Sequence, residues 1–168
     1  MKFASIALLA TTVATALANP VISRSPKEFK LKTTGSTNSE FNDLYLYSYH
    51  TGAGLSDGVL DGNATVATKF SLNGTVASAD LGTDFPWGLT VAGDTNYAAW
   101  EPVTINAGAS ETGFAISNGN FVWSSDDGFA GWLVCPWYHN APQLFGLISY
   151  YDPVIPSSCS KVTLKAVY

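Results

Sequence analysis

The chain has 168 residues, of which 46% are apolar, 13% aromatic and 12% charged, and its formal net charge is −5. This composition excludes a disordered chain, which would be poor in aromatic residues and rich in charge, and the length fits a single domain. Because the chain holds only 8 Lys and Arg residues, we expect no basic surface and therefore no nucleic-acid partner.

Residues 1–18 are predicted to be a secretory signal peptide. Lys2 precedes an uncharged apolar run that ends in Ala16-Leu17-Ala18, and a charged start, an apolar middle and a small-residue exit are typical of such a peptide. A membrane-spanning helix needs about 20 apolar residues, and this run is shorter. We therefore expect a secreted protein, extracellular or in the cell wall, with no membrane span after cleavage.

Residues 19–26 hold two prolines and no periodicity, and they are predicted to be a flexible leader. Arg24 in this leader could be a trimming site for a processing protease. The remaining residues, 27–168, are expected to fold as one β domain, because alternation of apolar and polar residues dominates them.

The clearest strand signal lies in residues 43–50. Tyr45, Tyr47 and Tyr49 occupy one face of an extended segment there, and Leu44 and Leu46 occupy the other. Alternation with a period of two indicates a β-strand. Shorter runs with strand character occupy residues 29–33, 65–72, 75–81, 87–92, 102–106, 113–117, 121–124, 131–135, 144–151 and 161–167.

Turn signals separate these runs, because 15 Gly and 8 Pro interrupt the chain every few residues. Asn118-Gly119 lies between two of the runs and accepts the positive φ angles of a tight hairpin turn. No segment after the leader shows helical periodicity over three turns. About ten short strands at this spacing predict an all-β fold, a single antiparallel β-sandwich or a closed β-barrel, with a β-trefoil-like fold as the alternative.

Cys135 and Cys159 are the only two cysteines in the sequence. An even pair in a secreted chain is most simply one disulfide, and closing a loop of this length should stabilise the fold by about 3 kcal/mol. Two free thiols, or a metal pair assisted by His50 or His139, are the alternatives. The spacing lacks the C-x-x-C of zinc sites, so we expect no metal and no cofactor.

Two segments match the acceptor pattern for N-glycosylation, at Asn63 and at Asn73. Both lie beside turn residues, and turns are exposed, so both asparagines are predicted to be glycosylated. Asp57 and Asp61 precede the first acceptor and could suggest calcium ligands together with Asn63. They lack the spacing of a calcium loop and are interpreted as turn residues.

The sequence contains no G-x-S-x-G, P-loop or H-E-x-x-H motif, so no catalytic residue is assigned. His50 and His139 could act as imidazole bases, but we expect ordinary surface histidines. Carboxylates could also work in pairs in glycoside hydrolysis, and the candidates are Asp94, Glu101, Glu111, Asp126 and Asp127.

Glu101 stands out among these carboxylates because it follows Trp100 directly. A large apolar ring beside it could raise its pKa toward that of a general acid. The more ordinary role for such a loop carboxylate is to cap backbone amides, and we favour that role.

The five tryptophans all fall between positions 87 and 137. Trp123 and Trp132 lie inside strand runs and are expected in the core. The other three lie beside Pro or Gly in expected loops, where exposed rings could stack on the apolar faces of sugars. The candidate ligand-binding residues are therefore Trp87, Trp100, Glu101 and Trp137.

Several segments resemble a group of small secreted fungal proteins described as a domain of unknown function. The resemblance runs from about residue 29 to residue 168 and is carried by residues 49–55, 85–88, 93–102, 131–135, 142–145 and 155–159. Residues 113–159 are more distantly similar to the fungal cell-wall protein PhiA. The resemblance implies a fungal source, secretion and wall association, and it supplies no catalytic residues.

The leading interpretation is a non-enzymatic protein, extracellular or associated with the cell wall, whose expected partner is cell-wall polysaccharide. One alternative is a polysaccharide hydrolase that uses Glu101 in a carboxylate pair. The other is a secreted effector that binds a host protein.

Overall fold

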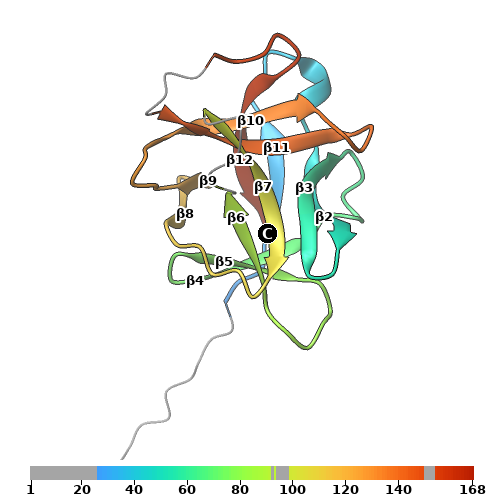
Figure 1. Ribbon diagram of the computed structural model, residues 1–168, viewed down its shortest axis with the longest axis vertical. Coiled ribbons are helices and arrows are strands. Elements are labelled where there is room, and N and C mark those ends of the chain that lie inside the picture. The colour runs from blue at the N-terminus through green and yellow to red at the C-terminus, as the bar shows by residue number, and fades with distance from the viewer. Residues whose placement is uncertain (1–25, 92, 94–98, 150–153) are drawn as a thin grey trace, which may run out of the picture.

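The computed structural model describes residues 26–91, 93, 99–149 and 154–168 (Figure 1). The expected signal peptide, the leader residues 19–25 with Arg24, and Asp94 lie outside these residues. A short 3₁₀ turn, η1 (Ser39–Phe41), joins the first two strands. The strands are β1 (Lys30–Thr34), β2 (Tyr45–Gly52), β3 (Leu55–Asp61), β4 (Lys69–Asn73), β5 (Val76–Asp80), β6 (Trp87–Val91), β7 (Trp100–Ala107), β8 (Phe114–Ser117), β9 (Asn120–Trp123), β10 (Phe129–Pro136), β11 (Pro142–Ile148) and β12 (Ser160–Val167).

Seven of these strands close into an antiparallel barrel. The ring runs β1–β2–β3–β7–β11–β10–β12 and returns to β1, and each neighbouring pair in it is antiparallel. The extra strands β6, β5 and β4 continue outward from β7, and β9 and β8 continue from β12. In Figure 1, β10 and β11 cross one end of the molecule, and β4 and β5 lie at the other. The predicted all-β fold is confirmed, in its closed-barrel form.

Local sequence explains the hairpins. β8 and β9 are joined at Asn118-Gly119, where both residues have positive φ angles, 51° and 77°. Positive φ at both central residues is the requirement of a two-residue hairpin turn, and Asn-Gly meets it at low cost. The turn predicted between these two strands is therefore confirmed.

Sequence reasoning missed β3, because three glycines and two aspartates make residues 54–62 resemble a turn region. In the structure this segment pairs with β2 from Tyr45↔Asp61 to His50↔Ser56. A side chain at Gly58 would lie 2.9 Å from the Val103 carbonyl oxygen. This glycine therefore allows a close approach of β7 rather than a turn.

One large apolar core fills the barrel and extends under the added strands. Its members come from nearly every strand, because inward side chains alternate along each of them. Trp132 is 2% exposed, as expected for a core residue, whereas Trp123 is only partly buried at the margin. Representative core residues are Leu31, Leu46, Leu60, Phe70, Leu89, Val103, Phe121, Leu144 and Leu164.

Trp87 belongs to this core, so the expectation that it lies in an exposed loop is wrong. It is the first residue of β6, pairs with Ala107 and is 7% exposed. Its indole Nε1 donates a hydrogen bond to Thr83 Oγ1 at 2.8 Å. The neighbouring Pro86 precedes the strand, a position at which proline costs no ladder hydrogen bond.

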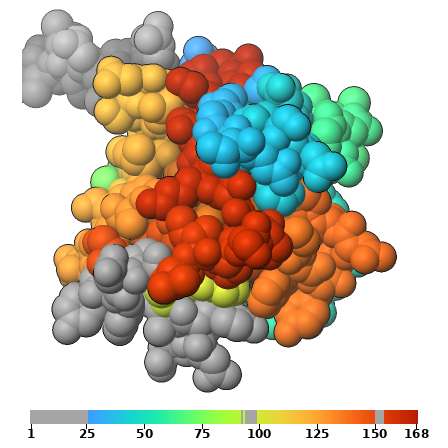
Figure 2. Space-filling model, turned by 90° about the horizontal axis from the view of Figure 1, so that it is seen from above, coloured from blue at the N-terminus to red at the C-terminus, as the bar shows by residue number. Residues whose placement is uncertain are grey.

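A second, smaller core lies on the outer face of the β10–β11 hairpin. Leu133, Cys135, Phe145 and Leu147 form it, and the segment before β12 covers it with Ile155 and Cys159. Figure 2 shows this C-terminal segment, in red, lying across the orange hairpin. The hairpin is thus buried on both faces, which explains its nearly continuous apolar sequence.

The predicted disulfide joins Cys135 to Cys159, with an S–S distance of 2.06 Å. Val134 pairs with Ser160 in the β10–β12 ladder, so the two cysteines lie directly opposite each other. The disulfide therefore attaches the covering segment to the hairpin beneath it.

Candidate functional site

A five-residue turn between β10 and β11 presents three aromatic side chains in a row. Pro136 and Pro142 pair at the ends of the two strands, and Trp137 N donates a hydrogen bond to the Ala141 carbonyl. Asn140 takes a positive φ of 55°, which asparagine tolerates better than most residues. This turn projects Trp137, Tyr138 and His139 from the barrel.

These side chains join two others to form what we name the outer aromatic face: Tyr49, Trp100, Trp137, Tyr138 and His139. The rings of Trp100 and Trp137 meet edge to face with centroids 5.7 Å apart. Both also contact Phe145 of the smaller core, at 5.1 and 5.5 Å. Tyr138 packs edge to face on Trp137 at 5.1 Å. The smaller core thus supports the rings of Trp100, Trp137 and Tyr138, and the chain links them to His139 through the neighbouring Tyr138.

A hydrogen-bonded pair lies at the edge of this face. His139 Nε2 donates to Asp57 Oδ2 at 2.8 Å, and the imidazole stacks on the Tyr49 ring with centroids 4.1 Å apart. Tyr49 and Asp57 are direct cross-strand neighbours in the β2–β3 ladder. The pair therefore ties the aromatic turn to the barrel wall.

Sequence reasoning did not find this pair, because Asp57 was interpreted as a turn residue and His139 as an ordinary surface histidine. Asp57 instead lies within β3. Asp61 and Asn63 do form a turn, in which Asp61 Oδ1 accepts a hydrogen bond from Asn63 N at 2.6 Å. The tyrosine alternation in β2 was the available signal, since it identifies Tyr49 as part of an outward-facing row.

The exposure of the outer aromatic face suits a stacking surface. Tyr138 is 80% exposed and Tyr49 is 39% exposed, while Trp100 and Trp137 are partly buried. Aromatic rings stack on the apolar faces of pyranose sugars, and carboxylate and imidazole groups accept and donate hydrogen bonds to hydroxyls. The rings provide the stacking surface, and the Asp57–His139 pair provides the hydrogen-bonding groups.

The structure separates Glu101 from this face. Along β7, Trp100 points outward, whereas Glu101 shares the inward face with Val103 and Ile105 and is 4% exposed. Consecutive strand residues point to opposite sides, so the expected placement of the Trp100 ring beside this carboxylate is wrong. Of the four candidate ligand-binding residues, the structure brings Trp100 and Trp137 together and places Glu101 and Trp87 elsewhere.

The other candidate carboxylates have separate settings. Glu111 Oε2 accepts a hydrogen bond from the backbone N–H of Val91 in β6, and Asp126 and Asp127 lie exposed in the β9–β10 turn. Within the described ranges, no three His, Cys, Asp or Glu side chains come together as a metal site. In the same ranges no helix is both long and apolar enough to cross a membrane.

Both glycosylation candidates have exposed side chains. Asn63 lies in the turn after β3, and its Oδ1 accepts hydrogen bonds from Thr65 N at 2.9 Å and from Thr65 Oγ1 at 2.8 Å. Asn73 ends β4 at the tight β4–β5 turn, where Gly74 has a φ of 62°. Each position is accessible to a modifying enzyme.

Comparison with known proteins identifies one family. The sequence profile described as a domain of unknown function, DUF7907, matches residues 26–168. No curated protein and no solved structure matches the chain.

Proposed function

Because the chain belongs to the DUF7907 family, whose description states no function, we propose a function from its surface. The protein is a non-enzymatic carbohydrate-binding protein, secreted by a fungus and extracellular or associated with the cell wall. Its ligand is a cell-wall polysaccharide, which it contacts through the outer aromatic face.

The observation that carries this proposal is the contact between Trp100 and Trp137. Two tryptophans from distant segments meet on the outside of the barrel instead of entering the main core, and the exposed Tyr138 ring extends the patch. The Asp57–His139 pair lies beside the rings. A sugar chain that lay along the rings would place hydroxyls within reach of these polar atoms.

Three sequence features support the extracellular location. The signal-peptide pattern of residues 1–18 is the first. The disulfide is the second, because disulfides persist in oxidising compartments. The exposed acceptor asparagines are the third. Secretion predicts a mature N-terminus near Asn19 or Ser25 and a mass that falls on glycosidase treatment, whereas an uncut protein retained in the cytosol would contradict this location.

The direct test is retention on insoluble chitin, β-glucan and cellulose. Tyr138→Ala and Tyr49→Ala should each weaken binding about 2- to 13-fold, because one aromatic contact is worth about 0.5–1.5 kcal/mol. Tyr138 is 80% exposed, so its removal should leave the fold intact. Phe85→Ala is the matched control, since this ring is 51% exposed but belongs to no part of the outer aromatic face.

Either of two kinds of result would overturn the proposal, one from the retention assay and one from an assay of sugar release. One is retention on none of the three polymers, or retention that Phe85→Ala weakens as much as Tyr138→Ala does. The other is release of soluble sugar from these polymers that Glu101→Gln abolishes, since that result would identify the hydrolase that we regard as the alternative.

A further inference from the structure

The six lysines that the structure describes gather around the paired strands β1 and β12. Lys30 and Lys32 alternate along the outer face of β1, and Lys165 of β12 lies directly opposite Lys32. The others are Lys27, Lys69 and Lys161. Strand pairing thus places Lys30, Lys32 and Lys165 on one outer face, although the chain has few basic residues. The absence of a nucleic-acid partner stays a prediction.

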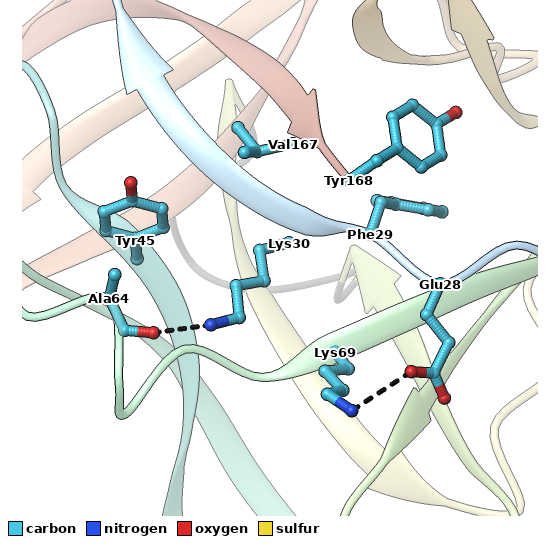
Figure 3. Close-up of a pocket in the computed structure, with 8 residues that line it drawn as sticks. All are labelled: Glu28, Phe29, Lys30, Tyr45, Ala64, Lys69, Val167 and Tyr168. Carbon is cyan, nitrogen blue, oxygen red and sulfur yellow. Dashed lines mark hydrogen bonds and ion pairs between the residues drawn. The ribbon is translucent and has the colours of Figure 1, made fainter.

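A hollow of about 410 Å³ opens beside this lysine group (Figure 3). Lys30 and Lys69 contribute its two ammonium groups, and Glu28 contributes a carboxylate. The rings of Tyr45 and Tyr168 also line it. We name this hollow the lysine pocket. Phe29, Ala64 and Val167 complete a lining that is mostly apolar, into which two cations and one carboxylate are set.

The two ammonium groups differ in their partners: Lys69 is paired with a carboxylate, whereas Lys30 is not. Lys30 Nζ donates to the neutral Ala64 carbonyl at 2.7 Å, and it forms no ion pair within the part of the chain that the structure describes. Lys69 Nζ lies 3.2 Å from Glu28 Oε2, with both side chains about half exposed, as Figure 3 shows. An exposed pair of this kind contributes little and exchanges partners readily.

The lysine pocket also has an anchored floor. Phe29 packs on Phe70 and on Tyr168, with centroids 6.3 and 6.1 Å apart. Backbone hydrogen bonds of 2.8 Å in both directions join Phe29 to Phe70. Lys27 Nζ lies 3.7 Å above the Tyr168 ring. Because β1, β4 and the end of β12 are fixed together here, the pocket is preformed.

We propose that the lysine pocket binds a carboxylated pyranose, a uronic acid unit of an acidic polysaccharide. The sugar carboxylate bridges Lys30 and Lys69, its ring lies against Tyr45 or Tyr168, and Glu28 accepts hydrogen bonds from its hydroxyls. This inference goes beyond the proposed function, because it uses none of the residues of the outer aromatic face.

The same groups argue against other polyanions. Glu28 repels any anion beside it, a sugar carboxylate included, but a pyranose also carries hydroxyl groups that can donate hydrogen bonds to Glu28, and a phosphate group alone does not. The net charge of −5 opposes long-range attraction to any polyanion, an oligogalacturonate included. Recognition must therefore be local, at one charged unit with hydroxyl groups, which describes a uronic acid residue.

The test is calorimetric titration of the intact protein with an oligogalacturonate of defined length. The comparison ligand is the same oligomer with its carboxyl groups reduced to alcohols. Lys30→Gln and Lys69→Gln should each weaken oligogalacturonate binding roughly tenfold or more, the value of a charged hydrogen bond. The carboxyl-reduced oligomer should bind the unaltered protein no more tightly than the oligogalacturonate binds the Lys30→Gln and Lys69→Gln variants.

Lys161→Gln is the matched control, because it removes the same charge from an exposed position that does not line the lysine pocket. Retention on chitin, β-glucan and cellulose is measured separately on the same lysine variants, so that a failure at the lysine pocket is distinguished from a failure at the outer aromatic face. Equal loss in Lys161→Gln, equal binding of the carboxyl-reduced oligomer, or tighter binding to phosphatidylserine vesicles or to DNA would each overturn the inference. Thermal unfolding of each variant shows that a loss of binding is not a loss of fold.

Discussion

Asp57 and His139 are far apart in the chain and meet only because β3 lies beside the β10–β11 turn. The same holds for Trp100 and Trp137, which require the β7–β11 pairing that places Trp100 opposite Leu147. Local patterns cannot predict such contacts, because they depend on which strands become neighbours. The sequence could indicate which residues were suited to binding, but it could not show which of them lie together.

Tyr47 provides a residue-scale prediction, because the fold alters its ionisation. Burial raises the pKa of its phenol above the ordinary value, and the nearby Asp61 carboxylate and Tyr49 raise it further. The folded chain therefore favours the neutral phenol, and the associated stability is present below about pH 10 and lost as pH rises through the raised pKa. Asp61→Asn should lower the pKa of Tyr47 toward its ordinary value, as NMR titration of the ring will show.

Tyr47→Phe is the control for this titration, because it removes the ionising group and keeps the ring. The variant should also reduce the loss of stability at alkaline pH. A pKa of Tyr47 that stays unchanged in Asp61→Asn would show that the carboxylate has no part in the shift.

Among the elements, β3 and β7 show where sequence patterns stop being informative. β3 buries residues on both faces, so its alternation is hidden, and the glycine that admits β7 resembles a turn signal. β7 begins two residues before the predicted run and so includes Trp100 and Glu101. Most other runs were recognisable, because one face of each is apolar and the other is polar.

Gly88 in β6 gives the prediction at this scale. A side chain there would overlap the Ala109 carbonyl oxygen and lie 2.6 Å from its carbonyl carbon. Gly88→Ala must therefore shift the backbone and should destabilise the protein by about 1–3 kcal/mol, as overpacking commonly does. Urea unfolding measures the change.

Gly62→Ala is the matched substitution, since no atom lies within 4 Å of the position that its side chain would occupy. It should change the free energy of unfolding by no more than about 0.5 kcal/mol. Equal losses in the two variants would mean that the close approach at Gly88 does not exist in solution.

At the scale of the whole molecule, the protein has two cores of different construction. The main core is enclosed by strands, and the smaller one is closed by a segment that the Cys135–Cys159 disulfide holds in place. Replacing both cysteines by alanine should cost about 3 kcal/mol of stability in the chain-entropy account. The melting temperature should fall by about 6–12 °C.

Scanning calorimetry with and without a reducing agent measures the same effect on the unaltered protein. The unreduced protein should also show no thiol that reacts with a labelling reagent after unfolding. A reactive thiol there, or a melting temperature that reduction does not change, would contradict the structural role of the disulfide.

The pairing of β12 with β1, β9 and β10 has a consequence for how the protein is made. The segment Ser160–Val167 is the last strand of the described chain and contributes to three separate ladders. Until the ribosome has added this segment, the barrel lacks one of its strands and its inward-facing side chains remain exposed to solvent. The closed barrel therefore cannot assemble until Ser160–Val167 has left the ribosome, so the earlier strands fold without a closed ring until that point.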